Sequence, residues 1–285
     1  MSPELIGMIG LLVFLILLSL RIPIAYVMLI TGLTGFGMLV SPSAALSMAT
    51  TEIYSTFSSY SLSVIPMFIL MGFIAYYSGV GSSLYNFAYK LVGHKRGGLA
   101  IATQAACAMF GAICGSNTAT AATMGTIALP EMRKYKYDDS LSAASVAAGG
   151  ALGVLIPPSV IFIVYGIASE QSIGKLFIAG IIPGILLTLM YMAAICVVVS
   201  RNPSLGPAGP KAGWKERAAG LKNGLFEVIV TFCISLGGLF AGWFTPTESG
   251  AVGAASILLI TALRRRLSWE GFKKSLMDTT RTTAM

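Results

Sequence analysis

The chain has 285 residues, of which 55% are hydrophobic and only 11% are charged. A soluble domain carries about a quarter charged residues, so this composition excludes an ordinary soluble protein. Its net charge of +8 comes from basic clusters between long apolar runs, which indicates membrane topology rather than nucleic-acid binding.

The sequence predicts an all-α polytopic membrane protein with about seven transmembrane helices and one re-entrant helical hairpin. Apolar runs of roughly 17 to 25 residues are long enough to cross a bilayer. The first run is followed rather than preceded by its basic residue, Arg21, which favours a retained helix over a cleaved signal peptide. The predicted spans are 5–20, 22–41, 61–79, 140–166, 175–199, 224–243 and 247–264.

The apolar stretch at about 98–130 is flanked by basic clusters on both sides. Cytoplasmic loops retain such clusters, so this stretch is predicted to enter and leave the membrane on the cytoplasmic side as a hairpin. Counting the other spans outward then places every basic cluster inside and the N-terminus in the periplasm. The clusters are Lys90, His94, Lys95, Arg96; Arg133, Lys134, Lys136; Lys211, Lys215, Arg217, Lys222; and Arg264, Arg265, Arg266.

The polar, proline-containing segment 201–223 is predicted to be a cytoplasmic linker between two parts of the chain. Residues 1–200 are predicted to form a first transmembrane repeat with its hairpin, and 224–285 the beginning of a second. Each part contains a helix, a break with proline and a further apolar helix, at Arg21-Ile22-Pro23 and at Phe244-Thr245-Pro246. Because the charge-based topology gives these regions opposite orientations, the pattern predicts an inverted repeat.

The middle of the predicted hairpin carries a polar break, in which Gly115 is followed by Ser116, Asn117 and Thr118. Glycine weakens a helix, and serine and asparagine bond readily to local backbone groups. Irregular backbone at membrane depth is tolerated only where it is buried in protein or lines a wet cavity. Freed carbonyls and side-chain oxygens suit a small hard cation, and the following helix N-terminus suits an anion. Tight packing of small residues is the alternative explanation.

The second break is the run from Gly153 through Ile156 to Pro157, Pro158 and Ser159. Two adjacent prolines remove two backbone donors, and each disfavours helix in the residue before it. The span 140–166 is therefore predicted to split near 156–159 with exposed carbonyls, an ordinary proline kink being the alternative. At a third break, Thr245 and Glu248 have the spacing of a capping box, which competes with a charged functional role for Glu248.

Five motifs, in this order, resemble the large membrane (permease) subunit of a TRAP (tripartite ATP-independent periplasmic) transporter. They are Gly115-Ser116-Asn117-Thr118-Ala119-Thr120, Ala128-Leu129-Pro130-Glu131-Met132, Gly153-Val154-Leu155-Ile156-Pro157-Pro158-Ser159, Glu170-Gln171-Ser172-Ile173-Gly174-Lys175-Leu176-Phe177 and Phe244-Thr245-Pro246-Thr247-Glu248.

The resemblance implies a sodium-coupled symporter that imports an organic acid, such as a C4-dicarboxylate or sialic acid, across the bacterial inner membrane. It implies two partners, a small four-helix membrane subunit and a periplasmic substrate-binding protein. No cofactor is implied beyond sodium as the coupling ion. The implied substrate and ion site comprises Gly115, Ser116, Asn117, Thr118, Gly153, Ile156, Pro157, Pro158 and Ser159, with Ser116 and Asn117 as sodium ligands.

The sequence departs from the family in length, because it reaches only the beginning of a second repeat. A truncated, non-transporting membrane scaffold or interaction subunit is therefore the alternative function. A passive channel is a further alternative function, since broken helices also line pores. A membrane enzyme is not expected, because no nucleophile–base set or metal motif occurs, and the four cysteines have no paired spacing.

Overall fold

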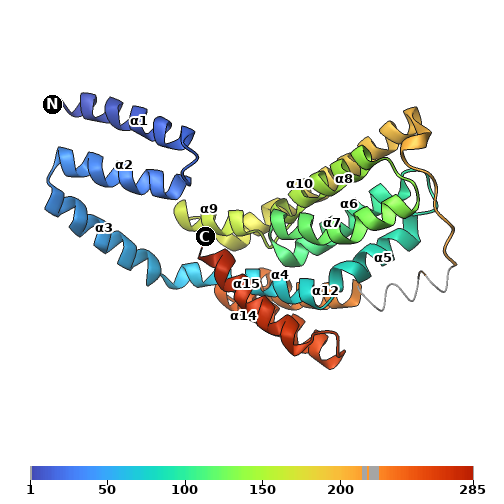
Figure 1. The fold of residues 1–285 in the computed structure, drawn as a ribbon. Helices are drawn as coiled ribbons and strands as arrows, with labels where there is room; N and C mark the ends of the chain where they lie inside the picture. The colour runs from blue at the N-terminus through green and yellow to red at the C-terminus, as the bar shows by residue number, and fades with distance from the viewer. Residues whose placement is uncertain (1, 214–216, 218–224, 285) are drawn as a thin grey trace. The chain divides into compact units, whose positions relative to one another are not determined.

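The structure is a computed structural model that describes residues 2–213, Arg217 and 225–284. Every regular element in these ranges is a helix, which confirms the all-α prediction (Figure 1). The chain divides into two compact units, Met1–Leu62 and Ser63–Met285. This division follows packing and differs from the predicted repeat boundary at 200, which stays a prediction. Lys215, Lys222 and the first residue of the predicted span 224–243 lie outside the described residues.

The first unit contains α1 (Pro3–Ser19), α2 (Ile24–Leu39) and α3 (Pro42–Phe57). The chain reverses after α1 where Arg21 takes a positive φ of 61° and Pro23 caps α2. Ser41 caps α3 by accepting a hydrogen bond from the N–H of Ala44 at 3.2 Å. Consecutive helices of this unit pack on each other. Most of their leucine, isoleucine and methionine side chains are exposed, as expected of helices that contact lipid.

The first helices of the second unit are α4 (Val64–Tyr77), which continues the 3-10 turn Tyr60–Ser63, and α5 (Val80–Val92). The predicted hairpin is formed by α6 (Gly98–Cys114) and α7 (Asn117–Lys134). After it come α8 (Asp139–Leu155), α9 (Val160–Ala168) and α10 (Ile173–Arg201). The later elements are α12 (Phe226–Phe232), a π-helical turn (Cys233–Gly237), α13 (Gly238–Phe240), α14 (Pro246–Leu263) and α15 (Trp269–Thr283).

The hairpin helix α6 lies at the centre of the second unit. It packs against α5, α7, α8, α10 and α4 (Figure 1), and 13 of its 17 residues are buried. Its Phe110 and Ile113 join Phe68, Met71 and Leu152 in one apolar core. Gly115, where the backbone at the end of α6 becomes irregular, is buried within protein, as the hairpin hypothesis requires.

Each of the seven predicted spans is mainly helical where it is described, and the span 140–166 contains two helices, α8 and α9. In the part of the chain that the structure describes, four helices are long and apolar enough to cross a membrane: Tyr60–Tyr77, Asp139–Ala168, Ile173–Arg201 and Pro246–Leu263. Pro3–Ser19, Ile24–Leu39, Gly98–Cys114 and Phe226–Phe240 are shorter apolar helices. Three helices, α3, α5 and α15, lie in segments for which no element was predicted.

The segment predicted as a linker is partly bound to residues of the predicted first repeat. The Leu205 carbonyl accepts from the N–H of Asp138 at 3.1 Å, and the Gly206 carbonyl accepts from Gly97 at 2.8 Å. The N–H of Gly209 donates to the Gly93 carbonyl at 2.9 Å. Residues 205–209, which we call the clasp, therefore bond to the loops at both ends of the α6–α7 hairpin.

Candidate functional site

The hairpin reverses at Gly115, between α6 and α7. Its N–H donates to the Gly111 carbonyl at 3.1 Å, and its φ of 64° lies in the left-handed region. A Cβ at this position would lie 2.6 Å from the carbonyl oxygen of Pro158. Glycine is therefore required at the tip both by its backbone conformation and by the close approach of the broken helix.

The three polar residues after Gly115 begin α7. Ser116 is the N-cap, and its Oγ accepts from the N–H of Ala119 at 3.3 Å. The Asn117 Oδ1 accepts from the N–H of Thr118 at 2.7 Å and from the Thr118 hydroxyl at 3.1 Å. The side-chain oxygen Oδ1 of Asn117 is occupied by these two bonds to Thr118. The exposed side-chain amide of Asn117 therefore has its NH2 group left to donate to a ligand.

The predicted split of the span 140–166 is present. The helix α8 ends at Leu155, and Ile156 is extended with φ −81° and ψ 125°. The peptide bond between Pro157 and Pro158 is cis. Ser159 is fully buried and caps α9, its Oγ accepting from the N–H of Phe162 at 3.4 Å. The double proline thus separates two half-helices rather than bending one continuous helix.

The hairpin tip and the split lie against each other. The N–H of Val160 donates to the Gly115 carbonyl at 3.4 Å. A Cβ on Gly153 would lie 2.7 Å from the Ser116 carbonyl oxygen, and one on Gly111 would lie 2.8 Å from the Cα of Gly153. The glycines of α6 and α8 therefore let the two backbones approach, and the N-termini of α7 and α9 come together.

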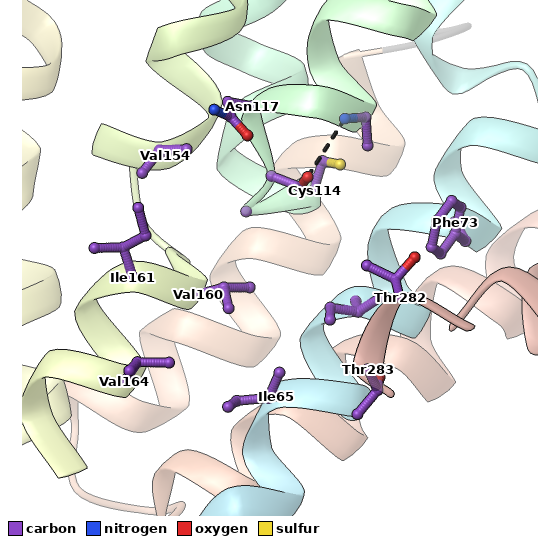
Figure 2. Close-up of a pocket in the computed structure, with 14 residues that line it drawn as sticks. Ile65, Phe73, Cys114, Asn117, Val154, Val160, Ile161, Val164, Thr282 and Thr283 are labelled. Carbon is purple, nitrogen blue, oxygen red and sulfur yellow. Dashed lines mark hydrogen bonds between the residues drawn. The ribbon is translucent and has the colours of Figure 1, made fainter. Parts of the chain in front are cut away.

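A cavity of about 340 Å³ opens beside this meeting point (Figure 2). Gly115, Ser116 and Asn117 line it at the hairpin, while Thr118 does not. Among the predicted residues of the broken helix, Gly153, Ile156, Pro157, Pro158 and Ser159 do not line it either. These residues form the break between α8 and α9, and their neighbours Val154 and Val160 line the cavity. The full lining is Ile65, Ile69, Phe73, Cys114, Gly115, Ser116, Asn117, Ala119, Val154, Val160, Ile161, Val164, Thr282 and Thr283.

Thr120 is a polar residue of this region that the sequence analysis did not single out as a ligand. It is fully buried, and its Oγ1 has no hydrogen-bond partner among the described residues. A Cβ on Gly153 would contact both this oxygen and the Ser116 carbonyl oxygen. Buried polar atoms without partners are uncommon in native proteins, so this oxygen is available to a ligand or water. Its position four residues after Ser116 on a helix was the available signal.

The third break forms the predicted capping box. The N–H of Thr245 donates to Glu248 Oε2 at 2.8 Å, and the N–H of Glu248 donates to Thr245 Oγ1 at 3.3 Å. The carboxylate is thus engaged at the N-terminus of α14.

The sequence-based prediction did not include a buried charged group, which is formed around Glu227. Glu227 is fully buried in α12, and its carboxylate pairs with Arg264 at 3.1 Å and Arg266 at 3.3 Å. Arg266 also donates to the Ser83 hydroxyl at 3.1 Å. In the sequence alone, these arginines are visible only as markers of topology. Arg264 and Arg266 connect the end of α14 to α12 through Glu227, and Arg266 also connects it to α5 through Ser83.

The family model of the DctM component of tripartite ATP-independent periplasmic transporters matches residues 11–285. The chain belongs to this family. This confirms the resemblance to TRAP large permease proteins, and the family and the apolar helices together support a multi-pass protein of the inner membrane.

Curated TRAP relatives agree with this assignment. The chain is 40% identical to the C4-dicarboxylate large permease protein DctM of Pseudomonas aeruginosa over 87% of its length and 57% of the relative's. It is 34% identical to the sialic acid permease protein SiaT of Haemophilus influenzae, over 88% of this chain and 40% of the relative's length. It is 36% identical to the ectoine/5-hydroxyectoine large permease protein UehC of Ruegeria pomeroyi, over 88% of this chain and 58% of the relative's length. The chain thus spans about half the length of the curated relatives it matches.

Proposed function

We propose that this chain carries the first half of the transport site of a sodium-coupled TRAP importer of organic acids. A periplasmic binding protein would deliver the solute, and a small four-helix membrane subunit would complete the membrane complex. The observation that carries the proposal is the contact between the hairpin tip and the broken helix beside a cavity. Relatives named for C4-dicarboxylate, sialic acid and ectoine support solute transport as the activity.

The two half-helices give the cavity a preference for anions. The N-termini of α7 and α9 both adjoin it, through Asn117 and Val160. Helix N-termini carry unpaired N–H groups and a partial positive charge, so a carboxylate is stabilised there. The Asn117 NH2 group adds a side-chain donor at the same end. A solute carboxylate would therefore bind at the hairpin tip.

The oxygen atoms around Gly153 suit the coupling ion. The Ser116 carbonyl and the unpartnered Thr120 hydroxyl both face Gly153, where no side chain intervenes. Sodium is a hard cation for which neutral carbonyl and hydroxyl oxygens are suitable ligands. An ion held by these oxygens would share the backbone of Ser116 with the anion site, and this shared residue would couple the two ligands.

The test replaces Ser116 and Asn117 by alanine in the full-length permease. Losing one buried polar partner costs about 1–3 kcal/mol, so we expect a roughly five- to hundred-fold loss in affinity for solute or sodium. The measurement is uptake of labelled solute against sodium concentration, with the amount of protein in the membrane checked in parallel. Saturable, sodium-dependent uptake by the parent protein also distinguishes a carrier from a channel.

The matched control is Thr126→Ala, because Thr126 is an exposed hydroxyl residue on the same helix, α7. Met124 is unsuitable, since its side chain is fully buried and truncation would leave a cavity. Sodium dependence equal to that of the parent in both Ser116→Ala and Asn117→Ala would remove the hairpin tip from the site.

A further inference from the structure

The cavity has a wall that the motifs of the hairpin and broken helix do not provide. Thr282 and Thr283, from the last turn of α15, line it together with the tip residues Ser116 and Asn117 (Figure 2). Apolar side chains of α4 and α9, such as Ile65 and Val164, also line the cavity (Figure 2). The cavity therefore has hydroxyl groups in a second region, supplied by a helix from the second repeat.

The position of α15 is fixed by its packing on α4. Gly271, Ser275 and Thr279 repeat every four residues and are buried, so one small-residue face of α15 contacts α4. Tyr77 of α4 donates its hydroxyl hydrogen to the Asp278 carboxylate at 2.5 Å. Because Asp278 lies one turn before Thr282, this bond holds the part of α15 that lines the cavity.

The two hydroxyl groups of α15 define what they can bind. The Thr283 hydroxyl donates its hydrogen to the Thr279 carbonyl at 2.8 Å, so its oxygen is left to accept from a ligand. The Thr282 hydroxyl can donate or accept. A solute hydroxyl or ammonium group donates hydrogen bonds, whereas a carboxylate only accepts them. Thr283 therefore complements a donor group rather than a carboxylate, and Thr282 can bind the same donor group by accepting from it.

We propose that α15 forms the second polar wall of the solute cavity, and that Thr282 and Thr283 bind a hydroxyl or ammonium group of an organic acid whose carboxylate lies at the hairpin tip. The inference rests on the proposed transport function and narrows its substrate class to hydroxy- or amino-substituted acids. The Tyr77 side chain acts as a positioning residue for this wall through Asp278.

Cysteine cross-linking tests the wall independently of transport. In a full-length permease whose native cysteines are replaced by serine, Asn117→Cys combined with Thr282→Cys should be joined by a short bismaleimide. The matched pair uses Thr280→Cys in place of Thr282→Cys. Thr280 is exposed, as Thr282 is, but it lies roughly 160° away around the helix axis. Tyr77→Phe should lower the yield, and Tyr76→Phe should not. Equal yields from the two cysteine pairs would overturn the placement of α15.

Three matched acids test the substrate class: butanoate, 4-hydroxybutanoate and succinate. Binding to the purified full-length permease in sodium is measured by calorimetry. We expect 4-hydroxybutanoate to bind best, and Thr282→Val with Thr283→Val to weaken it about tenfold while leaving butanoate and the Thr280→Val control unchanged. If succinate binds best and the valine variants change nothing, this inference is wrong while the proposed function stands. If none of the acids binds and Asn117→Ala leaves uptake unchanged, both fail.

Discussion

At the scale of single residues, the site depends on side chains that are absent as much as on those that are present. Gly153 and Gly115 allow the backbone of the broken helix to touch the hairpin tip. The sequence predicted this region because glycine and proline act locally on backbone conformation. Its one signal for Thr120 is the four-residue spacing from Ser116. Only the packing of α8 against α7 shows that the Thr120 hydroxyl is buried with no partner among the described residues.

Gly153→Ala should abolish or strongly impair sodium-dependent uptake while the protein still inserts in the membrane. Its Cβ would lie 2.7 Å from the Ser116 carbonyl, which forces the tip and the split apart. Gly125→Ala is the matched control on α7, because its Cβ would meet only Val146 Cγ1 at an ordinary 3.7 Å. Uptake is measured as a function of sodium concentration for both variants. Equal impairment would show that replacing glycine by alanine disturbs these helices in general, rather than separating the tip from the split.

Glu248→Gln should keep most of the parent's uptake. Glutamine can also occupy the last position of a capping box and bond to the N–H of Thr245. Glu248→Ala removes only the N3 half of the capping box, because Thr245 Oγ1 still accepts from the N–H of residue 248, and it should lower thermal stability in detergent slightly. A glutamine variant that is made in normal amounts but has lost its sodium dependence would show that the charge of Glu248 takes part in coupling.

At the scale of elements, prediction succeeded where an apolar run or its interruption is visible in the chain. The spans, the hairpin reversal and the double-proline split all produce such signals. The helices α3, α5 and α15 were missed because they mix polar and apolar residues and have no long apolar run. In α15, the contact face consists of Gly271, Ser275 and Thr279, whose burial depends on α4 rather than on their own hydrophobicity.

The hairpin hypothesis predicts the membrane side of the loops on either side of α6 and α7. Single cysteines placed at Lys95 and Lys136 should both be protected from an impermeant thiol reagent in intact cells. Cysteines at Ser2 and Ser172 should react, because both are predicted to lie outside. Reaction at Lys136 with protection at Lys95 would mean that 98–130 crosses the membrane once, and the predicted N-terminal orientation would then need revision.

At the scale of the whole second unit, charge pairing connects segments that are far apart in the chain. Glu227 lies in α12, and its partner Arg266 also bonds to Ser83 in α5. The turn that presents these arginines has Arg265 at a positive φ of 54°, with Arg266 donating to the Thr261 carbonyl. Sequence alone could not predict this network, because its members are far apart in the chain and each is an ordinary residue locally.

Glu227→Ala should destabilise the folded protein markedly, by about 3–5 kcal/mol, because it leaves two arginines beside a buried site without their carboxylate. Thermal unfolding in detergent measures the effect. Glu270→Ala is the control, since Glu270 forms an exposed pair with Lys274 within one helix and its loss should change little. Similar unfolding temperatures for both variants would show that the buried network does not stabilise the unit.

The clasp has a practical consequence for work on this protein. Tags, protease sites and fluorescent domains are usually inserted into segments between repeats, where backbone groups are free of tertiary contacts. Residues 205–209 instead donate to or accept from Gly93, Gly97 and Asp138, and a Cβ on Gly206 would lie 3.0 Å from the Cα of Gly97. An insertion there would separate the loops at the two ends of the hairpin. The exposed loop at Glu170 and Gln171, between α9 and α10, is the better position for a reporter.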